Sequence, residues 1–267
     1  MQISITGLGA ILSYLIASVL LICPLLKKRS LPQDMRKRFF TIGFIGILLH
    51  GFSLYPALMT NNGINLGFLN AASLIGLASI SLLLISSIRY PIENLCIAFM
   101  PGTAIIIAIN MAYPSGHTIN ESLTWQLQLH ILLSIFAYSI LALAALQALL
   151  LSFQERHLHN HHPGGLVRAL PPLQLMEDLL FQMIRVGFIL LSLALFSGIL
   201  FLEDLFAQHL VHKTVLSIIA WAVFAILLWG RSTMGWRGRT AIRWTLGGFA
   251  FLVLAYFGSK LVLEILL

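Results

Sequence analysis

Apolar residues are gathered into eight long stretches, and short segments rich in polar residues separate them. Each stretch is close to the roughly 20 residues that an α-helix needs to cross a bilayer. Because the connections are short, the pattern predicts an all-α fold, a polytopic membrane bundle of about eight transmembrane helices that forms a single integral-membrane domain over residues 1–267. The predicted spans lie at about residues 5–26, 39–59, 67–88, 95–113, 126–152, 179–202, 214–230 and 243–264.

The overall composition also indicates a bilayer environment. Hydrophobic residues make up 59% of the 267 positions and charged residues only 9%, whereas soluble domains carry about 25% charged residues. We therefore expect the lipid bilayer to surround most of the chain and no soluble domain to remain outside the bundle.

The basic residues lie mostly on one side of the predicted bundle. The net charge is +7, and thirteen of the sixteen Lys and Arg residues fall in connections that eight spans place on the same face. By the positive-inside rule this face is cytoplasmic and both termini lie outside. Because the charge follows the membrane topology, we expect no nucleic-acid binding. The thirteen residues are Lys27, Lys28, Arg29, Arg36, Lys37, Arg38, Arg89, Arg156, Arg168, Arg231, Arg237, Arg239 and Arg243.

The longest cytoplasmic connection covers about residues 153–178 and has two parts. The first, QERHLHNHHPGG, holds four histidines in six residues. Such a cluster can capture zinc or nickel, but the following Pro and Gly residues favour a solvated loop. The second part places Pro171 and Pro172 ahead of a helix start, with Glu177 and Asp178 in its early turns, where the helix dipole favours acids.

Two histidines lie inside predicted spans, and a third opens one. His130 and His50 are within apolar stretches, and His212 precedes the seventh stretch on the outer face that His130 also approaches. Ionisable side chains at membrane depth are costly and usually mark a ligand, an ion or a proton path. Neutral imidazole is a common axial ligand, so haem is the first candidate cofactor. The alternative is that each histidine is a hydrogen-bonded packing residue between helices.

The expected depths allow more than one pair of iron ligands. His130 lies about five residues below the outer end of its span, or about 7–8 Å, and His50 about nine residues below, or about 13–14 Å. His212 lies at the outer edge. A His50–His130 pair and a His130–His212 pair are therefore both open, and the sequence does not choose between them.

Three further residues could contact a bound haem near the outer face. Lys213 and Lys260 could pair with haem propionates, or they could extend to the lipid headgroups. Trp125 could stack on the macrocycle, although tryptophan is common at membrane interfaces. The sequence has no HExxH, GxSxG or Walker motif and no pair of intramembrane carboxylates, so we expect no enzyme activity.

Three stretches resemble one family of membrane proteins. They are LQLHILLSIFAYSILALAALQALL, LPPLQLMEDLLF, and the C-terminal helix pair with its GWRG turn at residues 235–238. These stretches are similar to the cytochrome c assembly (CcsA/CcmC-like) family over about residues 40–265. The size and the HLVHKT segment are most similar to its YpjD/HemX-like branch.

The resemblance implies a bacterial inner-membrane protein that handles or binds haem, or that assists cytochrome biogenesis, with haem b the expected type. The basic residues place both termini in the periplasm. His130 matches the family's external ligand histidine, and His50 falls where members often carry a histidine. Two family features are missing. The connection FLEDLFAQHLVHKT lacks the tryptophan-rich loop of haem-delivering members, and no histidine follows the last predicted span.

Together these observations predict a haem-binding inner-membrane protein with an accessory or regulatory role in cytochrome c biogenesis or haem handling. Another membrane protein of cytochrome or haem biogenesis is the expected partner, besides haem and lipid. The first alternative is a haem exporter or a haem-delivery subunit. The second is a cofactor-free structural or regulatory subunit of a transport or haem-biosynthesis complex.

Overall fold

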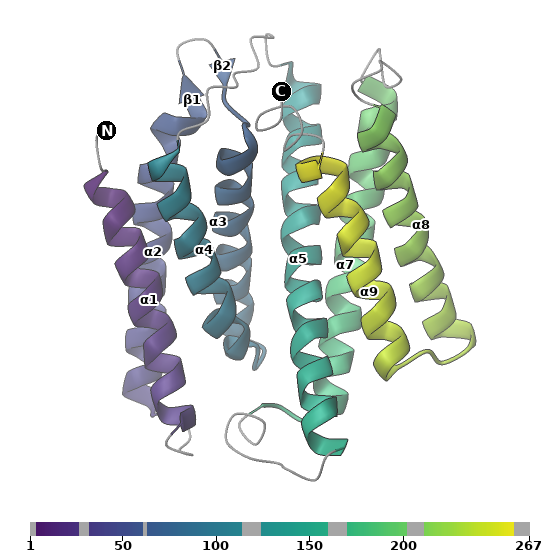
Figure 1. Ribbon diagram of the computed structural model, residues 1–267, viewed down its shortest axis with the longest axis horizontal. Helices are drawn as coiled ribbons and strands as arrows, with labels where there is room; N and C mark the ends of the chain where they lie inside the picture. Colours follow the sequence, from purple (N-terminus) through teal and green to yellow (C-terminus); the bar gives the residue numbers. More distant parts are fainter. Residues whose placement is uncertain are drawn as a thin grey trace. The chain divides into compact units, whose positions relative to one another are not determined.

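A computed structural model describes residues 4–26, 32–60, 63–113, 124–159, 170–201 and 211–258 (Figure 1). Eight helices in these ranges are long and apolar enough to cross a membrane, which confirms the predicted all-α membrane fold. The elements are α1 (Ile5–Leu26), α2 (Gln33–Leu58), β1 (Met59–Thr60), β2 (Gly63–Ile64), α3 (Phe68–Ser87), η1 (Glu93–Leu95), α4 (Cys96–Ala112), α5 (Trp125–His159), α7 (Leu173–Phe201), α8 (Val211–Thr233), α9 (Gly238–Val253) and the π-helical turn η2 (Leu254–Gly258).

Several helices extend further into the polar segments than the apolar pattern indicated. α5 continues to His159, so the predicted loop around the clustered histidines begins later than expected, and His157 is helical. His159 ends α5, and residues 160–169, with His161 and His162, lie outside the described residues. α7 begins at Leu173, directly after Pro171 and Pro172, as predicted from the preference of proline for helix starts. Hydrophobicity sets the length within the bilayer, but backbone hydrogen bonds can continue a helix beyond it.

The chain divides into two compact units. Unit 1 comprises residues 1–121 and 157–171, and unit 2 comprises residues 122–156 and 172–267. The units are described separately below. The prediction that residues 1–267 form a single membrane domain stays a prediction.

Unit 1 contains α1 to α4, and it packs through close helix contacts. α1 lies against α2 and α4, and α3 also contacts both α2 and α4. A Cβ atom added at Gly46 on α2 would lie only 2.7 Å from the ring of Tyr14 on α1. The absence of a side chain at Gly46 therefore lets the buried Tyr14 ring lie directly against the backbone of α2.

Unit 2 contains α5, α7, α8 and α9 (Figure 1). α5 and α7 run antiparallel and touch at both ends. Where α5 begins and α7 ends, the rings of Trp125 and Phe201 meet edge to face with centroids 5.8 Å apart. Near the opposite end, the Gln147 side-chain amide donates a 2.9 Å hydrogen bond to the backbone carbonyl of Met176. α8 packs against α7 and α9.

The turn between α8 and α9 depends on glycine. Gly235 and Gly238 have φ values of +66° and +51°, in the left-handed region that other residues rarely adopt. The indole of Trp236 covers Gly230, where an added Cβ would lie 2.5 Å from the ring. These contacts explain in physical terms why the GWRG sequence forms this turn.

Replacing Gly238 with alanine is expected to destabilise the protein by about 1–2 kcal/mol, because an L-residue in the left-handed region is strained. The new Cβ would also lie 2.9 Å from Oε1 of Glu155. Gly247→Ala is the matched control, because a Cβ there meets nothing within 4 Å and alanine favours the helix. Thermal unfolding in detergent should show a lower midpoint for Gly238→Ala alone, and equal midpoints for both variants would contradict this account of the turn.

Candidate functional site

His130 of α5 is held from one side by two groups on α7. Its Nδ1 lies 3.0 Å from the backbone carbonyl oxygen of Ala194 and 3.1 Å from Oγ of Ser197. Ala194 and Ser197 are both buried, whereas His130 is partly exposed. The imidazole is therefore attached to α7 through one ring nitrogen only.

These partners determine which nitrogen of His130 carries the proton. A carbonyl oxygen can only accept, so Nδ1 must carry the hydrogen and donate it. The Ser197 hydroxyl donates its own hydrogen to the same Ala194 carbonyl at 2.8 Å, so it too accepts from Nδ1. Nε2 then holds an unshared electron pair, and no described residue forms a hydrogen bond with it. An imidazole in this state is ready to ligate a metal.

His50 of α2 has a different environment in unit 1. It is 1% exposed, and both ring nitrogens have partners. Nδ1 lies 3.2 Å from the hydroxyl of Tyr14 on α1, and Nε2 lies 2.8 Å from Oγ of Ser73 on α3. Hydroxyls can donate or accept, so these contacts do not fix the tautomer. They do join three helices through one buried side chain.

The two intramembrane histidines thus differ in what they can do. His130 offers a lone pair without losing a hydrogen bond. His50 would have to give up its bond to Tyr14 or Ser73 before it could ligate iron, which leaves a buried hydroxyl unpaired at a cost of about 1–3 kcal/mol. Because His50 and His130 belong to different units, their pairing as iron ligands stays a prediction.

The other predicted site residues lie at the starts of α5 and α8 or outside the described residues. His212 is exposed in the first turn of α8, next to the partly buried Lys213. Trp125 begins α5, is 65% exposed and already packs against Phe201. This position is typical of an interfacial tryptophan, and stacking on a macrocycle stays a prediction. Lys260 lies outside the described residues.

In the part of the chain that the structure describes, the donors fit haem better than a bare metal ion. Within the described ranges, no group of three or more His, Cys, Asp or Glu side chains could hold a metal ion. A structural zinc needs about four protein ligands. In haem the porphyrin supplies four nitrogens, so one or two imidazoles suffice. The single imidazole of His130, whose Nε2 makes no hydrogen bond with any described residue, therefore meets the requirement of an axial haem ligand.

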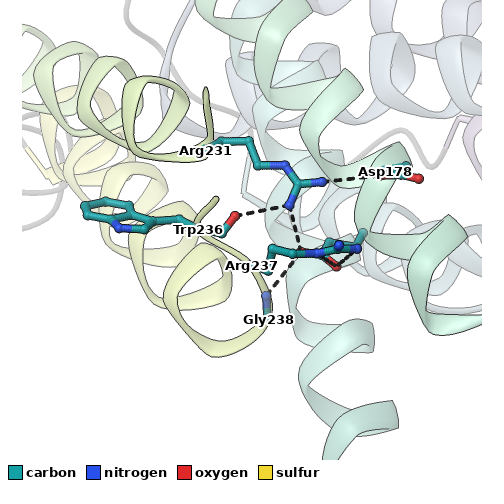
Figure 2. Close-up of polar contacts among 6 residues, drawn as sticks. Asp178, Arg231, Trp236, Arg237 and Gly238 are labelled. Atoms are coloured by element: carbon teal, nitrogen blue, oxygen red, sulfur yellow. Dashed lines mark hydrogen bonds and ion pairs between the residues drawn. The ribbon is translucent and has the colours of Figure 1, made fainter. Parts of the chain in front are cut away.

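A second polar site, which we call the Glu177 cluster, lies near the start of α7, the end of α8 and the start of α9, and Figure 2 shows its polar contacts. The carboxylate of Glu177 on α7 is only 4% exposed. The guanidinium of Arg237 donates to both of its oxygens, at 3.2 and 3.1 Å, and the backbone N–H of Gly238 donates at 3.2 Å. Arg231 donates to the Glu177 carboxylate at 3.5 Å and to Asp178 at 3.4 Å.

The Glu177 cluster connects the start of α7 to the turn between α8 and α9. Arg231 also donates to the Trp236 carbonyl at 3.3 Å, and its guanidinium lies 4.5 Å from the centre of the Phe181 ring. Sequence reasoning explained Glu177 by the helix dipole and missed this role. The available signal was a carboxylate pair after Pro171 and Pro172 together with arginines flanking a glycine-containing turn. All the charges have partners within the cluster, so its geometry indicates a structural role.

Comparisons with known proteins give a consistent result. A family model described as Cytochrome C assembly protein matches residues 39–267. The chain is 31% identical over 266 residues to the inner membrane protein YpjD of Escherichia coli (strain K12), covering 97% of this chain and 98% of that protein.

More distant relatives match shorter regions. The cytochrome c biogenesis protein CcsA of Mesostigma viride is 31% identical over 91 residues, covering 33% of this chain and 30% of that protein. Protein HemX of Brevibacillus brevis is 22% identical over 169 residues, covering 61% of this chain and 62% of that protein. No solved structure matches the chain.

Proposed function

The chain belongs to the cytochrome c assembly protein family, and from that premise we propose that it binds haem in the bacterial inner membrane and takes part in cytochrome c biogenesis or haem handling. The eight apolar helices make it a multi-pass membrane protein. Within this role we propose an accessory or regulatory function and no enzyme activity. The expected partners are haem, the lipid bilayer and another membrane protein of cytochrome or haem biogenesis.

The observation that carries the proposal is the state of His130. Its Nδ1–H is used by the Ala194 carbonyl and by Ser197, which leaves Nε2 as the one nitrogen able to act as an axial ligand. Haem bound there, proposed to be haem b, would supply an iron centre and two propionate anions. The protein would supply the imidazole, an apolar wall of helices, and Lys213 and Lys260 for the propionates.

The second axial ligand in this proposal is either His50 or His212. His212 is exposed, so ligation would not remove it from a buried hydrogen bond. His50 would first have to break a bond to Tyr14 or Ser73. This difference favours His212, and the assignment remains part of the proposal.

Two other functions need separate tests. A haem exporter or haem-delivery subunit would need an outer site that hands haem to a partner, but the connection between α7 and α8 lacks the tryptophan-rich loop of delivering members. A cofactor-free structural or regulatory subunit is favoured by one observation: both nitrogens of His50 already have partners, so this buried histidine has a structural explanation.

The test of the proposal is an optical titration of the detergent-purified protein with haemin. A saturable Soret band that shifts from the position of free haemin is the expected result. Delivery can be tested afterwards by adding an apocytochrome and following loss of the band. No saturable spectrum at any haemin concentration would contradict haem binding and leave the cofactor-free subunit as the proposal.

The topology proposed from the basic residues gives a further prediction. A reporter active only in the cytoplasm should be active when fused at residue 160 and inactive when fused after residue 267, because the basic connections are retained on the cytoplasmic side. The complementary periplasmic reporter serves as the control at both positions. Periplasmic activity at residue 160 would contradict the proposed orientation.

A further inference from the structure

We propose that Ser197 is a positioning residue for His130: together with the Ala194 carbonyl, it holds the imidazole in the tautomer and orientation in which Nε2 can ligate iron. This inference rests on the proposed function for its purpose. The tautomer and orientation of the His130 imidazole in the ligand-free protein follow from the contacts alone. Nothing in the sequence pattern pointed to Ser197.

The contacts form a closed triangle between α5 and α7. His130 Nδ1 lies 3.0 Å from the Ala194 carbonyl oxygen and 3.1 Å from Ser197 Oγ, and the Ser197 hydroxyl donates to the same carbonyl at 2.8 Å. Because the Ser197 hydroxyl donates its one hydrogen to this carbonyl, its oxygen can only accept a hydrogen bond from Nδ1. With two acceptors beside it, Nδ1 is the nitrogen that keeps its hydrogen.

Ser197 contacts a titratable side chain of the neighbouring helix, the His130 imidazole of α5. Like Ser139 and Ser192, it also donates to a backbone carbonyl of its own helix, which is the usual way a helical serine satisfies its hydroxyl. Ser192 in addition accepts a 2.8 Å hydrogen bond from the Trp221 indole of α8, so what distinguishes Ser197 from Ser192 is that its partner on the neighbouring helix is a histidine. Ser197 is 5% exposed, so water is excluded as a ready substitute for its oxygen. Its position therefore serves His130 and not only α7.

Loss of the Ser197 hydroxyl should loosen this arrangement without breaking it. In Ser197→Ala the Ala194 carbonyl can still accept from Nδ1, but it is then the only acceptor beside Nδ1. The ring should therefore leave the carbonyl for part of the time, and in that part neither its tautomer nor its orientation is fixed. Partners of a ligating histidine typically change metal affinity by about 10–100-fold. Because one of two partners remains, we expect about tenfold weaker haemin binding.

The first arm of the test needs no haem. Nitrogen NMR of the ¹⁵N-histidine-labelled apoprotein, with His130→Gln to assign the signals, should show His130 in the Nδ1–H tautomer. Ser197→Ala should shift the signals toward a mixture of both tautomers, whereas Ser197→Thr, which keeps a hydroxyl, should retain the wild-type pattern. Ser139→Ala is the matched control, since it removes a buried serine hydroxyl of unit 2 that does not contact His130.

The second arm is a haemin titration of the wild type, Ser197→Ala, Ser197→Thr and Ser139→Ala. The expected result is weaker binding for Ser197→Ala only. If the wild type binds no haemin but the NMR shifts occur as stated, the positioning role stands and the proposed function fails. If Ser197→Ala matches wild type in both tautomer and affinity, or if Ser139→Ala changes as much, the role assigned to Ser197 is overturned.

Discussion

Replacing His130 with alanine is expected to abolish the low-spin Soret spectrum of the haemin-loaded protein. The variant loses an imidazole whose Nδ1 is fixed by a backbone carbonyl and whose Nε2 has no hydrogen-bond partner in the described part of the chain. The fold should persist, because the partly exposed ring leaves a small gap and the Ala194 carbonyl keeps its bond from Ser197. Optical spectra and thermal unfolding of the same sample separate loss of ligand from loss of structure.

Variants of the other two histidines identify the opposite axial ligand. Whichever of His50→Ala and His212→Ala removes the true partner should convert a low-spin spectrum to a high-spin one, and the other should leave the spectrum nearly unchanged. His50→Ala should also lower the thermal midpoint, since Tyr14 and Ser73 lose a buried partner worth about 1–3 kcal/mol. Wild-type haemin affinity in His130→Ala would show that the site has been placed at the wrong histidine.

Replacing Glu177 with alanine is expected to reduce stability by about 3 kcal/mol, the lower end of the range for breaking a buried ion pair. The lower end applies because Arg237 is 50% exposed and water screens it. The variant removes the group that receives bonds from Arg231, Arg237 and the Gly238 backbone N–H. Thermal unfolding in detergent measures the loss.

Asp178→Asn is the control for the Glu177 prediction. Asp178 neighbours Glu177 and contacts the same Arg231, but it is 49% exposed and has one contact of 3.4 Å. Exposed ion pairs contribute about 0–1 kcal/mol, so this variant should unfold close to wild type. Similar midpoints for the two variants, or an unchanged midpoint for Glu177→Ala, would show that the Glu177 cluster does not hold α7 to the α8–α9 turn.

The sequence predicted the helices well because the bilayer allows few alternatives. A backbone surrounded by lipid must form its hydrogen bonds internally, so each long apolar stretch predicts a helix. The ends were less accurate, as at α5 and α7, where helices continue through residues that hydrophobicity assigns to connections. Backbone hydrogen bonding and proline placement, and not apolarity, determine those ends.

The candidate site was predicted only in part. Depth in the membrane singled out His130 and His50 as unusual, but it treated them alike. Their difference depends on partners that lie 64 and 67 residues away for His130 and 36 and 23 residues away for His50. One of those partners is a backbone carbonyl, which every residue possesses, so no residue type could have marked it. The structural role of Glu177 was missed because its arginine partners lie more than 50 residues away in the sequence.

The antiparallel contacts of α5 and α7 have a mechanical consequence. Trp125 meets Phe201 and Gln147 meets Met176, at levels about 33 Å apart along α5 at 1.5 Å per residue, and the bond from His130 to Ala194 lies between them. A shift of one helix along the other by a single turn, about 5.4 Å, would break every one of these contacts together. Sliding of one helix along the other would therefore break all of these contacts at once, and we expect the register of α5 and α7 to stay fixed in any rearrangement linked to the binding proposed at His130.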